Sequence, residues 1–137
     1  MSYAGDVTPE QAYEALSEDP TAVLVDVRTR AEWAYVGVPV LDEIAKEPLF
    51  VQWQTYPHGE INMGFIEELR ELGVTNGRPV YFLCRSGVRS AFAASALTAT
   101  GGGPAYNIVD GFEGIHDQYD HRTLGGWKSA GLPWRQG

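Results

Sequence analysis

The chain has 137 residues, of which 18 are acidic and 10 basic, so its formal net charge at pH 7 is −8. An acidic balance of this size argues against nucleic acid or an anionic membrane surface as a partner. A single cysteine excludes an intramolecular disulfide and a cysteine-rich zinc site, and no apolar run approaches the roughly 20 residues that span a bilayer. The N-terminus has no secretory signal pattern, so we expect a cytoplasmic protein with one domain over residues 1–137.

The first predicted elements are a helix and a buried strand. Thr8 is the expected N-cap of a helix in which Gln11 supplies the capping-box partner. Residues 22–27 form a continuous apolar, β-branched run ending in Asp-Val, which is typical of a strand buried on both faces. A short helical turn over residues 29–35 and a short strand over residues 38–41 are expected next.

The second half of the chain continues the alternation of helices and strands. An amphipathic helix is predicted over residues 65–72, a strand over 80–83, a helix after Arg89 and a last strand over 105–109. Such alternation predicts an α/β fold with a mostly parallel central sheet and helices on both faces.

Residues 42–63 fit this alternation badly, because they are long, rich in aromatic residues and without a clear period. Segments of that kind are usually functional loops or disordered. The three histidines, His58, His116 and His121, lack the spacing of metal ligands, although nearby aspartates leave a weak zinc site conceivable. We favour a solvated polar loop for His116 and His121, and we expect neither a metal nor an organic cofactor.

Cys84 lies where a cysteine becomes a nucleophile, at the end of a strand and before a Gly-containing loop that opens a helix. A thiol there is near the positive end of the helix, and the loop amides can point at its sulfur. Arg85 and Arg89 add positive charge, so the setting favours the reactive thiolate. The alternative, an inert core cysteine, is disfavoured by these two arginines. Against the acidic background, they indicate a site for a small anion.

The end of the strand over residues 22–27 carries a second group of charges. Ligands of a parallel α/β sheet bind beyond the carboxyl ends of its strands, where both Asp26 and Cys84 are expected. Arg28 and Glu32 are four residues apart on the predicted helical turn, so we favour a structural ion pair between them. Asp26, Arg28 and Glu32 are therefore predicted to support the site, and a direct role in shaping it is the second interpretation.

Four stretches together resemble the single-domain rhodanese-like sulfurtransferases. Residues 23–33 resemble the family's Asp-Val-Arg-x-x-x-Glu-aromatic signature, and residues 84–90 resemble its catalytic loop, including the Arg-Ser-Gly core. Residues 107–112 and 126–133 resemble two C-terminal elements of the family. The stretches occur in the right order along nearly the whole chain, so the resemblance implies a rhodanese-like fold.

The resemblance also implies a function. In the family, the catalytic cysteine carries a persulfide, a role that falls on Cys84 here. The donor would be a small sulfur-containing anion such as thiosulfate, and the acceptor would be cyanide, a small thiol or a protein thiol. The residues expected to bind the substrate are those that follow the cysteine: Arg85, Ser86, Gly87, Val88, Arg89 and Ser90. Residues 42–63 and a polar insert over 113–122 depart from the family pattern and could cover the site.

Two alternatives stay open. Cysteine phosphatases and arsenate reductases also place a thiolate in an anion-binding loop, but in phosphatases an arginine stands six positions after the cysteine. That position is Ser90 here, and the arginine is Arg89, one residue too early. The other alternative is a non-catalytic module that relays sulfur between partners or senses redox state.

Overall fold

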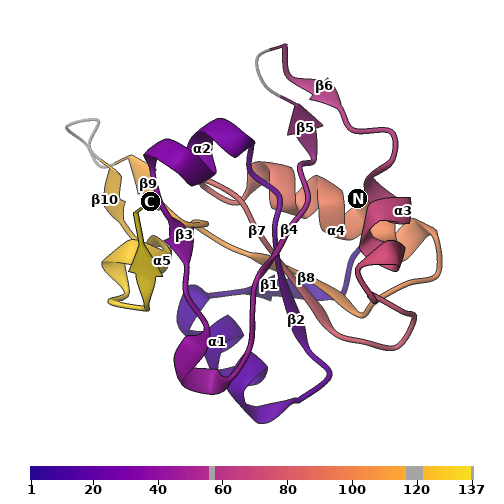
Figure 1. The fold of residues 1–137 in the computed structure, drawn as a ribbon, viewed down its shortest axis with the longest axis horizontal. Coiled ribbons are helices and arrows are strands. Elements are labelled where there is room, and N and C mark those ends of the chain that lie inside the picture. The colour runs from indigo at the N-terminus through magenta and orange to yellow at the C-terminus, as the bar shows by residue number, and fades with distance from the viewer. Residues whose placement is uncertain (56–57, 117–121, 137) are drawn as a thin grey trace.

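The computed structural model describes residues 1–55, 58–116 and 122–136. Its centre is a five-stranded sheet in which neighbouring strands are all parallel, in the order β1-β8-β7-β2-β4 (Figure 1). These strands are β1 (Gly5–Val7), β2 (Val23–Asp26), β4 (Leu49–Phe50), β7 (Val80–Leu83) and β8 (Ala105–Ile108). The predicted parallel sheet is confirmed.

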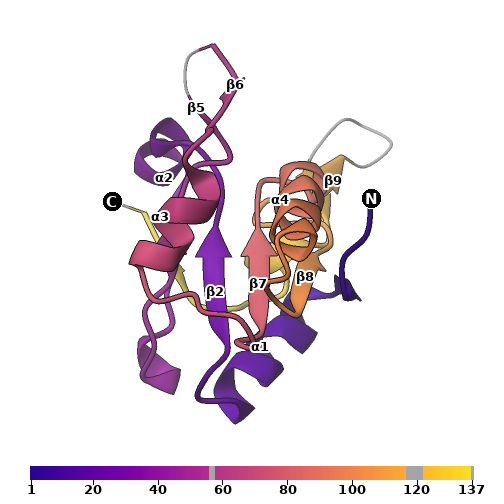
Figure 2. The same ribbon diagram turned by 90° about the vertical axis from the view of Figure 1, so that its right-hand side faces the viewer.

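Helices cover both faces of this sheet, as predicted (Figure 2). They are α1 (Pro9–Glu18), α2 (Arg30–Tyr35), α3 (Phe65–Glu71), α4 (Val88–Ala99) and α5 (Gly126–Ser129), with a 3₁₀ turn at Asp42–Ile44. α3 and α4 pack with Val25 and Phe82 on one face, whereas α1 and α5 pack with Leu24 and Leu83 on the other. Successive residues of β2 and β7 point to opposite faces, so two hydrophobic clusters enclose each strand.

The starts of α1 and α2 follow from local capping. Thr8 Oγ1 accepts a hydrogen bond from the Gln11 amide at 3.1 Å, and Gln11 Oε1 accepts one from the Thr8 amide at 2.9 Å. This is the capping box predicted for α1. Thr29 and Glu32 form the same reciprocal pair at the start of α2. Glu32 therefore has a structural task at the helix end before any contact with the rest of the molecule is considered.

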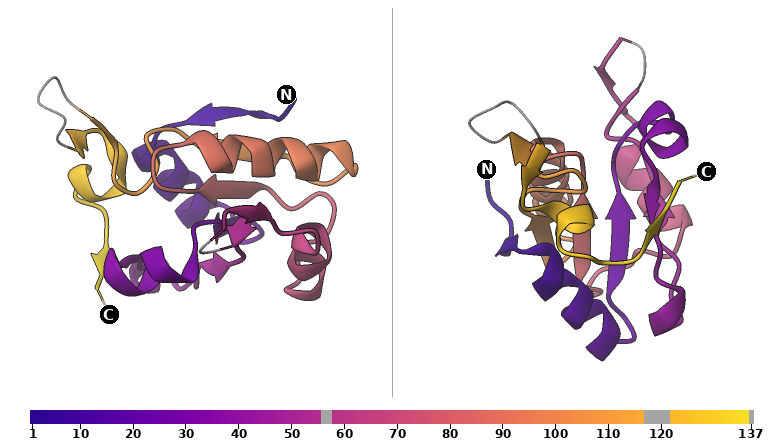
Figure 3. Two further views of the ribbon diagram at one scale, coloured as in Figure 1. Left: turned by 90° about the horizontal axis from the view of Figure 1, so that it is seen from above. Right: turned by 90° about the vertical axis from the view of Figure 1, so that its left-hand side faces the viewer.

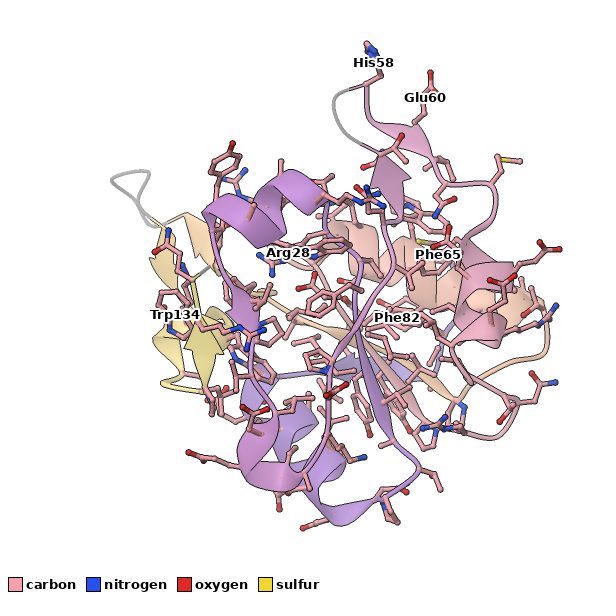
Figure 4. All side chains as sticks on the ribbon, in the orientation of Figure 1. Arg28, His58, Glu60, Phe65, Phe82 and Trp134 are labelled. Atoms are coloured by element: carbon pink, nitrogen blue, oxygen red, sulfur yellow. The ribbon has the colours of Figure 1, made fainter. Side chains whose placement is uncertain are left out.

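The segment over residues 42–63 is more regular than its sequence indicates. Strand β4 extends the parallel sheet by pairing with the end of β2, and β5 (Gln54–Thr55) pairs antiparallel with β6 (Glu60–Ile61). The hairpin projects from the body of the protein, with His58 and Glu60 at its far end, whereas Phe65 and Phe82 lie in the interior (Figure 4). Strands of two residues are too short to show a period, which explains why sequence patterns missed them.

The C-terminal part of the chain returns to the first half. Strand β11 (Trp134–Arg135) pairs antiparallel with β3 (Val38–Pro39), which is shorter than the predicted strand over residues 38–41 (Figure 3). Within the polar insert, β9 (Ile115–His116) pairs with β10 (Arg122–Leu124). His121 and the aspartates of the alternative zinc site lie outside the described residues. In the described ranges, no helix is long and apolar enough to cross a membrane.

Candidate active site around Cys84

Cys84 follows β7 directly, at the carboxyl end of a central strand. The neighbouring strand β2 ends beside it, because Asp26 is in register with Leu83 and the Val27 amide donates to the Leu83 carbonyl at 2.8 Å. Helix α4 begins four residues after the cysteine, at Val88. The geometry expected from the sequence is therefore present: a thiol between a strand end and the N-terminus of a helix.

Cys84 is buried, with 1% of its surface exposed. Its sulfur contacts two polar groups of the residues that follow it. The Gly87 amide donates to Sγ at 3.1 Å, and Ser90 Oγ lies 3.1 Å from Sγ. Gly87 has φ +105°, and a Cβ there would lie 3.3 Å from the Asp110 amide nitrogen. Glycine is thus favoured at this position, since both the backbone angle and the space disfavour a side chain.

The loop is held from behind by residues 110–114, which we call the strap. The Phe112 amide donates to the Cys84 carbonyl at 2.8 Å, and the Glu113 amide donates to the Arg85 carbonyl at 3.0 Å. In a trans peptide the carbonyl and the following N–H point in opposite directions. The N–H groups of Arg85 and Ser86 are therefore directed away from the strap.

Several loop amides are available to a ligand. Within the described part of the chain, the amides of Arg85, Ser86, Val88 and Arg89 donate to no acceptor. Val88 and Arg89 lie in the first turn of α4, whose N–H groups have no partner inside the helix and whose dipole favours negative charge. Together with the Gly87 amide on Sγ, these groups form a set of neighbouring donors suited to an anion.

Arg89 is bound by Glu32, which corrects the predicted pair between Arg28 and Glu32. Arg89 Nη1 and Nη2 donate to the two carboxylate oxygens of Glu32 at 2.6 and 2.9 Å. Arg28 instead donates from Nη2 to Asp26 at 2.6 Å and to the Gly37 carbonyl at 2.8 Å, fully buried. Arg28 precedes the N-cap Thr29, so the spacing rule for residues within a helix does not apply to it.

The Glu32–Arg89 pair changes the protonation of both groups. Burial is the largest influence on Glu32 and by itself raises its pKa, but the hydrogen bond and charge of Arg89 outweigh it, with smaller help from Thr29 and Arg28. The pKa of Glu32 therefore lies below its ordinary value. Burial likewise lowers the pKa of Arg89, and the hydrogen bond and charge of Glu32 outweigh it and raise the pKa. Both groups are held in their charged forms at neutral pH.

Arg85 also faces a carboxylate, although more loosely. Its Nε lies 3.1 Å from Glu113 Oε2, and its side chain is 48% exposed. Each arginine of the loop thus has an acidic neighbour, Glu32 or Glu113. The sequence predicts positive charge from Arg85 and Arg89 at this point, and local patterns do not indicate the carboxylates of Glu113 and Glu32 that face them. The structure shows that the loop amides are the donors left without partners inside the described protein.

Ser90, predicted from the sequence to bind the substrate, has partners behind the sulfur that the sequence does not indicate. Ser90 Oγ donates to Asn107 Oδ1 at 2.6 Å, and Asn107 Nδ2 donates to Asp6 Oδ1 at 3.1 Å. The three residues come from α4, β8 and β1, and their separations of 17 and 101 positions match no local motif. Only the sheet topology brings them together.

A cavity of about 320 Å³ opens beside the loop. It is lined by Trp53, Gln54, Ile61, Val88, Arg89 and Phe92. The first three come from the segment over residues 42–63, so this segment does lie next to the loop. Among the described residues, no cluster of three or more His, Cys, Asp or Glu side chains could hold a metal ion.

Comparison with known families gives a match over almost the whole chain. The family model described as STR4 middle domain, a rhodanese-like family, matches residues 4–137. The chain belongs to the STR4 middle domain family. One relative is the "Uncharacterized protein RP600 homolog" of Rickettsia rickettsii, which is 40% identical to this chain. The match covers 95% of this chain and 96% of the relative. The "Protein THYLAKOID RHODANESE-LIKE, chloroplastic" of Oryza sativa is 31% identical over 95% of this chain but only 25% of its own.

Two solved structures are similar to this chain. The crystal structure of Rv0390 from M. tuberculosis has a TM-score of 0.90 and 54% identity, and the match covers 99% of this chain and 100% of that one. The polysulfide-sulfur transferase homodimer from Wolinella succinogenes has a TM-score of 0.64 at 23% identity, covering 96% of this chain and 78% of that one. The second likeness supports the fold alone. The predicted rhodanese-like fold is confirmed.

Proposed function

We propose that this protein is a sulfurtransferase that moves sulfane sulfur from an anionic donor to a thiol or cyanide through a persulfide on Cys84. One observation carries the proposal: the only thiol of the chain lies at the start of a loop whose Gly87 amide donates to the sulfur and whose other amides have no acceptor in the described protein. Preorganised amides of this kind stabilise negative charge where it develops during a reaction. Membership of a rhodanese-like family supports sulfur transfer as the general chemistry.

The first half of the reaction loads the sulfur. With thiosulfate as donor, the Cys84 thiolate attacks the outer sulfur, a new S–S bond forms, and the bond between the two donor sulfurs breaks. Sulfite leaves with the electron pair of that bond, so two negative charges enter with the donor and two leave with sulfite. The outer persulfide sulfur then carries the negative charge among the amides of Arg85, Ser86, Val88 and Arg89.

The second half unloads it. A cyanide ion or a thiolate attacks the outer sulfur, the S–S bond to Cys84 breaks, and the enzyme thiolate is regenerated. No metal or organic cofactor takes part in either half. Because Arg89 and Arg85 each face a carboxylate, we assign most of the anion binding to the loop amides and a supporting role to the two guanidinium groups, with Ser86 as a further donor. Ser90 is buried and its hydroxyl donates to Asn107, so we assign it to the sulfur of Cys84 and not to the donor anion.

The acceptor would reach the loop past the cavity beside Arg89. Trp53, Gln54 and Ile61 line that cavity, so residues 42–63 are in a position to restrict which thiol approaches. This placement supports the idea that the segment contributes to acceptor choice. The proposal treats residues 1–137 as one catalytic domain acting on small molecules or protein thiols in the cytoplasm.

The test uses the fact that Cys84 is the only cysteine. The protein is incubated with thiosulfate and analysed by intact mass spectrometry, and one added sulfur atom is expected. Cys84→Ser should take up no sulfur and form no thiocyanate with cyanide, while its circular dichroism spectrum stays that of the wild type. Hydrolysis of p-nitrophenyl phosphate is measured in parallel. Phosphatase turnover comparable to sulfur transfer and lost in Cys84→Ser would overturn the proposal in favour of the phosphatase alternative.

A further inference from the structure

A chain of hydrogen bonds leads from the Cys84 sulfur across the sheet to strand β1. Sγ lies 3.1 Å from Ser90 Oγ, Ser90 lies 2.6 Å from Asn107 Oδ1, and Asn107 Nδ2 lies 3.1 Å from Asp6 Oδ1. Ser90 is fully buried and Asn107 is 5% exposed. Buried polar side chains of this kind are satisfied by one another, so the direction of each hydrogen bond constrains the next.

Asp6 determines which group donates in each of these hydrogen bonds. An ionised carboxylate only accepts hydrogen bonds, so the Asn107 NH₂ group faces Asp6 and its oxygen faces Ser90. Ser90 has one hydroxyl hydrogen, which it donates to that oxygen. In the contact between Cys84 and Ser90, the donor is then the thiol S–H and the acceptor is Ser90 Oγ.

Loss of the thiol proton creates a conflict. The thiolate sulfur needs donors, and the Ser90 hydroxyl can serve it only by turning its hydrogen away from Asn107. We propose that Asn107, held by Asp6, is a positioning residue that competes with the Cys84 thiolate for the single hydroxyl hydrogen of Ser90. Asn107 thereby favours the protonated sulfur over the bare thiolate.

The same competition implies that the Ser90 hydroxyl hydrogen changes its acceptor during the reaction cycle. This step rests on the proposed sulfur transfer. In the persulfide, Sγ is bonded to the outer sulfur, which carries the charge, and Sγ becomes a weak acceptor like a thioether. The Ser90 hydrogen can then return to Asn107. The hydroxyl would serve Sγ only in the bare thiolate, the form that attacks the donor.

Other charges surround the loop and must be held constant in a test. They are the ion pairs Asp26–Arg28, Glu32–Arg89 and Arg85–Glu113, and the carboxyl group of Asp6 with Tyr3, whose hydroxyl donates to Asp6 Oδ1 at 2.7 Å. Asn107→Leu changes none of them. Asp6→Ala removes one charge together with the acceptor, whereas Asp6→Asn removes the same charge and keeps an oxygen that accepts from Asn107. The comparison of the two Asp6 variants separates charge from hydrogen-bond direction.

The experiment follows the ionisation of Cys84 directly. Protein labelled with ¹³C at cysteine Cβ gives one cysteine resonance, whose shift reports thiol and thiolate across a pH titration without any reagent having to reach the sulfur. Ser90→Ala should move the midpoint upward by about one to two pH units, because a hydrogen bond to the thiolate is lost. Asn107→Leu should move it downward by about half to one unit, because the competing acceptor is gone.

Asp6→Ala should lower the midpoint further than Asp6→Asn, because the freed amide can rotate its NH₂ group toward Ser90. A midpoint for Asn107→Leu at or above that of the wild type would overturn the proposal. Equal midpoints for the two Asp6 variants would also overturn it, and Asp6 is exposed, so this comparison survives if Asn107→Leu does not fold. The titration needs no sulfur donor, so its failure is distinguishable from failure of the proposed sulfur transfer.

Discussion

Replacement of Glu32 by glutamine isolates the ion pair that joins α2 to the catalytic loop. Glutamine can still accept from the Thr29 amide, so the capping box of α2 is preserved while the charge opposite Arg89 is lost. Hydrogen bonds to charged groups contribute about 1.5–3 kcal/mol, and fully exposed ion pairs about 0.2–1 kcal/mol. With side chains only 19% and 20% exposed, the pair is closer to the first case, so we expect a loss near the lower end of that range, about 1.5–2 kcal/mol.

A loss of this size should lower the melting temperature by about 5–8 °C in a domain of this length. Glu14→Gln is the matched control, because Glu14 is an exposed helical glutamate without a side-chain partner in the described residues. Urea unfolding of Glu32→Gln, Arg89→Gln and the double variant gives the coupling energy between the two side chains. Additive effects of the two single changes would refute the reasoning.

The pH dependence of the same variant provides an independent check. The pKa of Glu32 is depressed in the folded protein, so its stabilisation is present above its ordinary pKa of 4.5 and is lost as pH falls through the lower folded value. The difference in melting temperature between the wild type and Glu32→Gln should therefore be full at pH 7 and shrink below about pH 4.5. A difference that stayed constant into strong acid would show that the charge of Glu32 is not responsible.

Two further predictions concern the loop and its strap. Arg89→Ala should raise the KM for thiosulfate about tenfold, since one charge-assisted contact to the donor is lost, and unchanged steady-state kinetics would remove Arg89 from the binding site. Gly111→Ala should lower the melting temperature by about 5 °C or more, because its Cβ would collide with the backbone of Cys84 and Arg85 at φ +56°. Gly131→Ala is its control, with φ +75° but nothing within 4 Å, and an equal loss there would exclude the collision as the cause.

Local patterns in the sequence predicted those parts of the molecule that depend on local physics. The position of Cys84 between a strand and a helix follows from an apolar run and a glycine a few residues apart. The capping box of Thr8 and Gln11 requires only residues three positions apart, and both its hydrogen bonds are present. The parallel sheet follows from the alternation of strands and helices.

The partners of the site residues depend on topology and were beyond local patterns. Glu32 is four positions from Arg28 but pairs with Arg89, which is 57 positions away, because the ends of β2 and β7 lie side by side. The link from Ser90 through Asn107 to Asp6 likewise joins one helix and two neighbouring strands of the sheet, which are far apart in the sequence. Strand β4 is not predicted from the sequence, because a strand of two residues is too short to show an alternation of apolar and polar side chains.

The strap holds two carbonyls of the catalytic loop through main-chain hydrogen bonds, in addition to the ion pair between Arg85 and Glu113. The amides of Phe112 and Glu113 donate to the carbonyls of Cys84 and Arg85. These hydrogen bonds orient the loop backbone whatever side chains the loop positions carry. The side chains at positions 85, 86 and 88 can therefore be varied while the chemistry at the sulfur is retained. A library randomised at these three positions is a practical route to new donor and acceptor preferences, with little of its diversity lost to misfolded proteins.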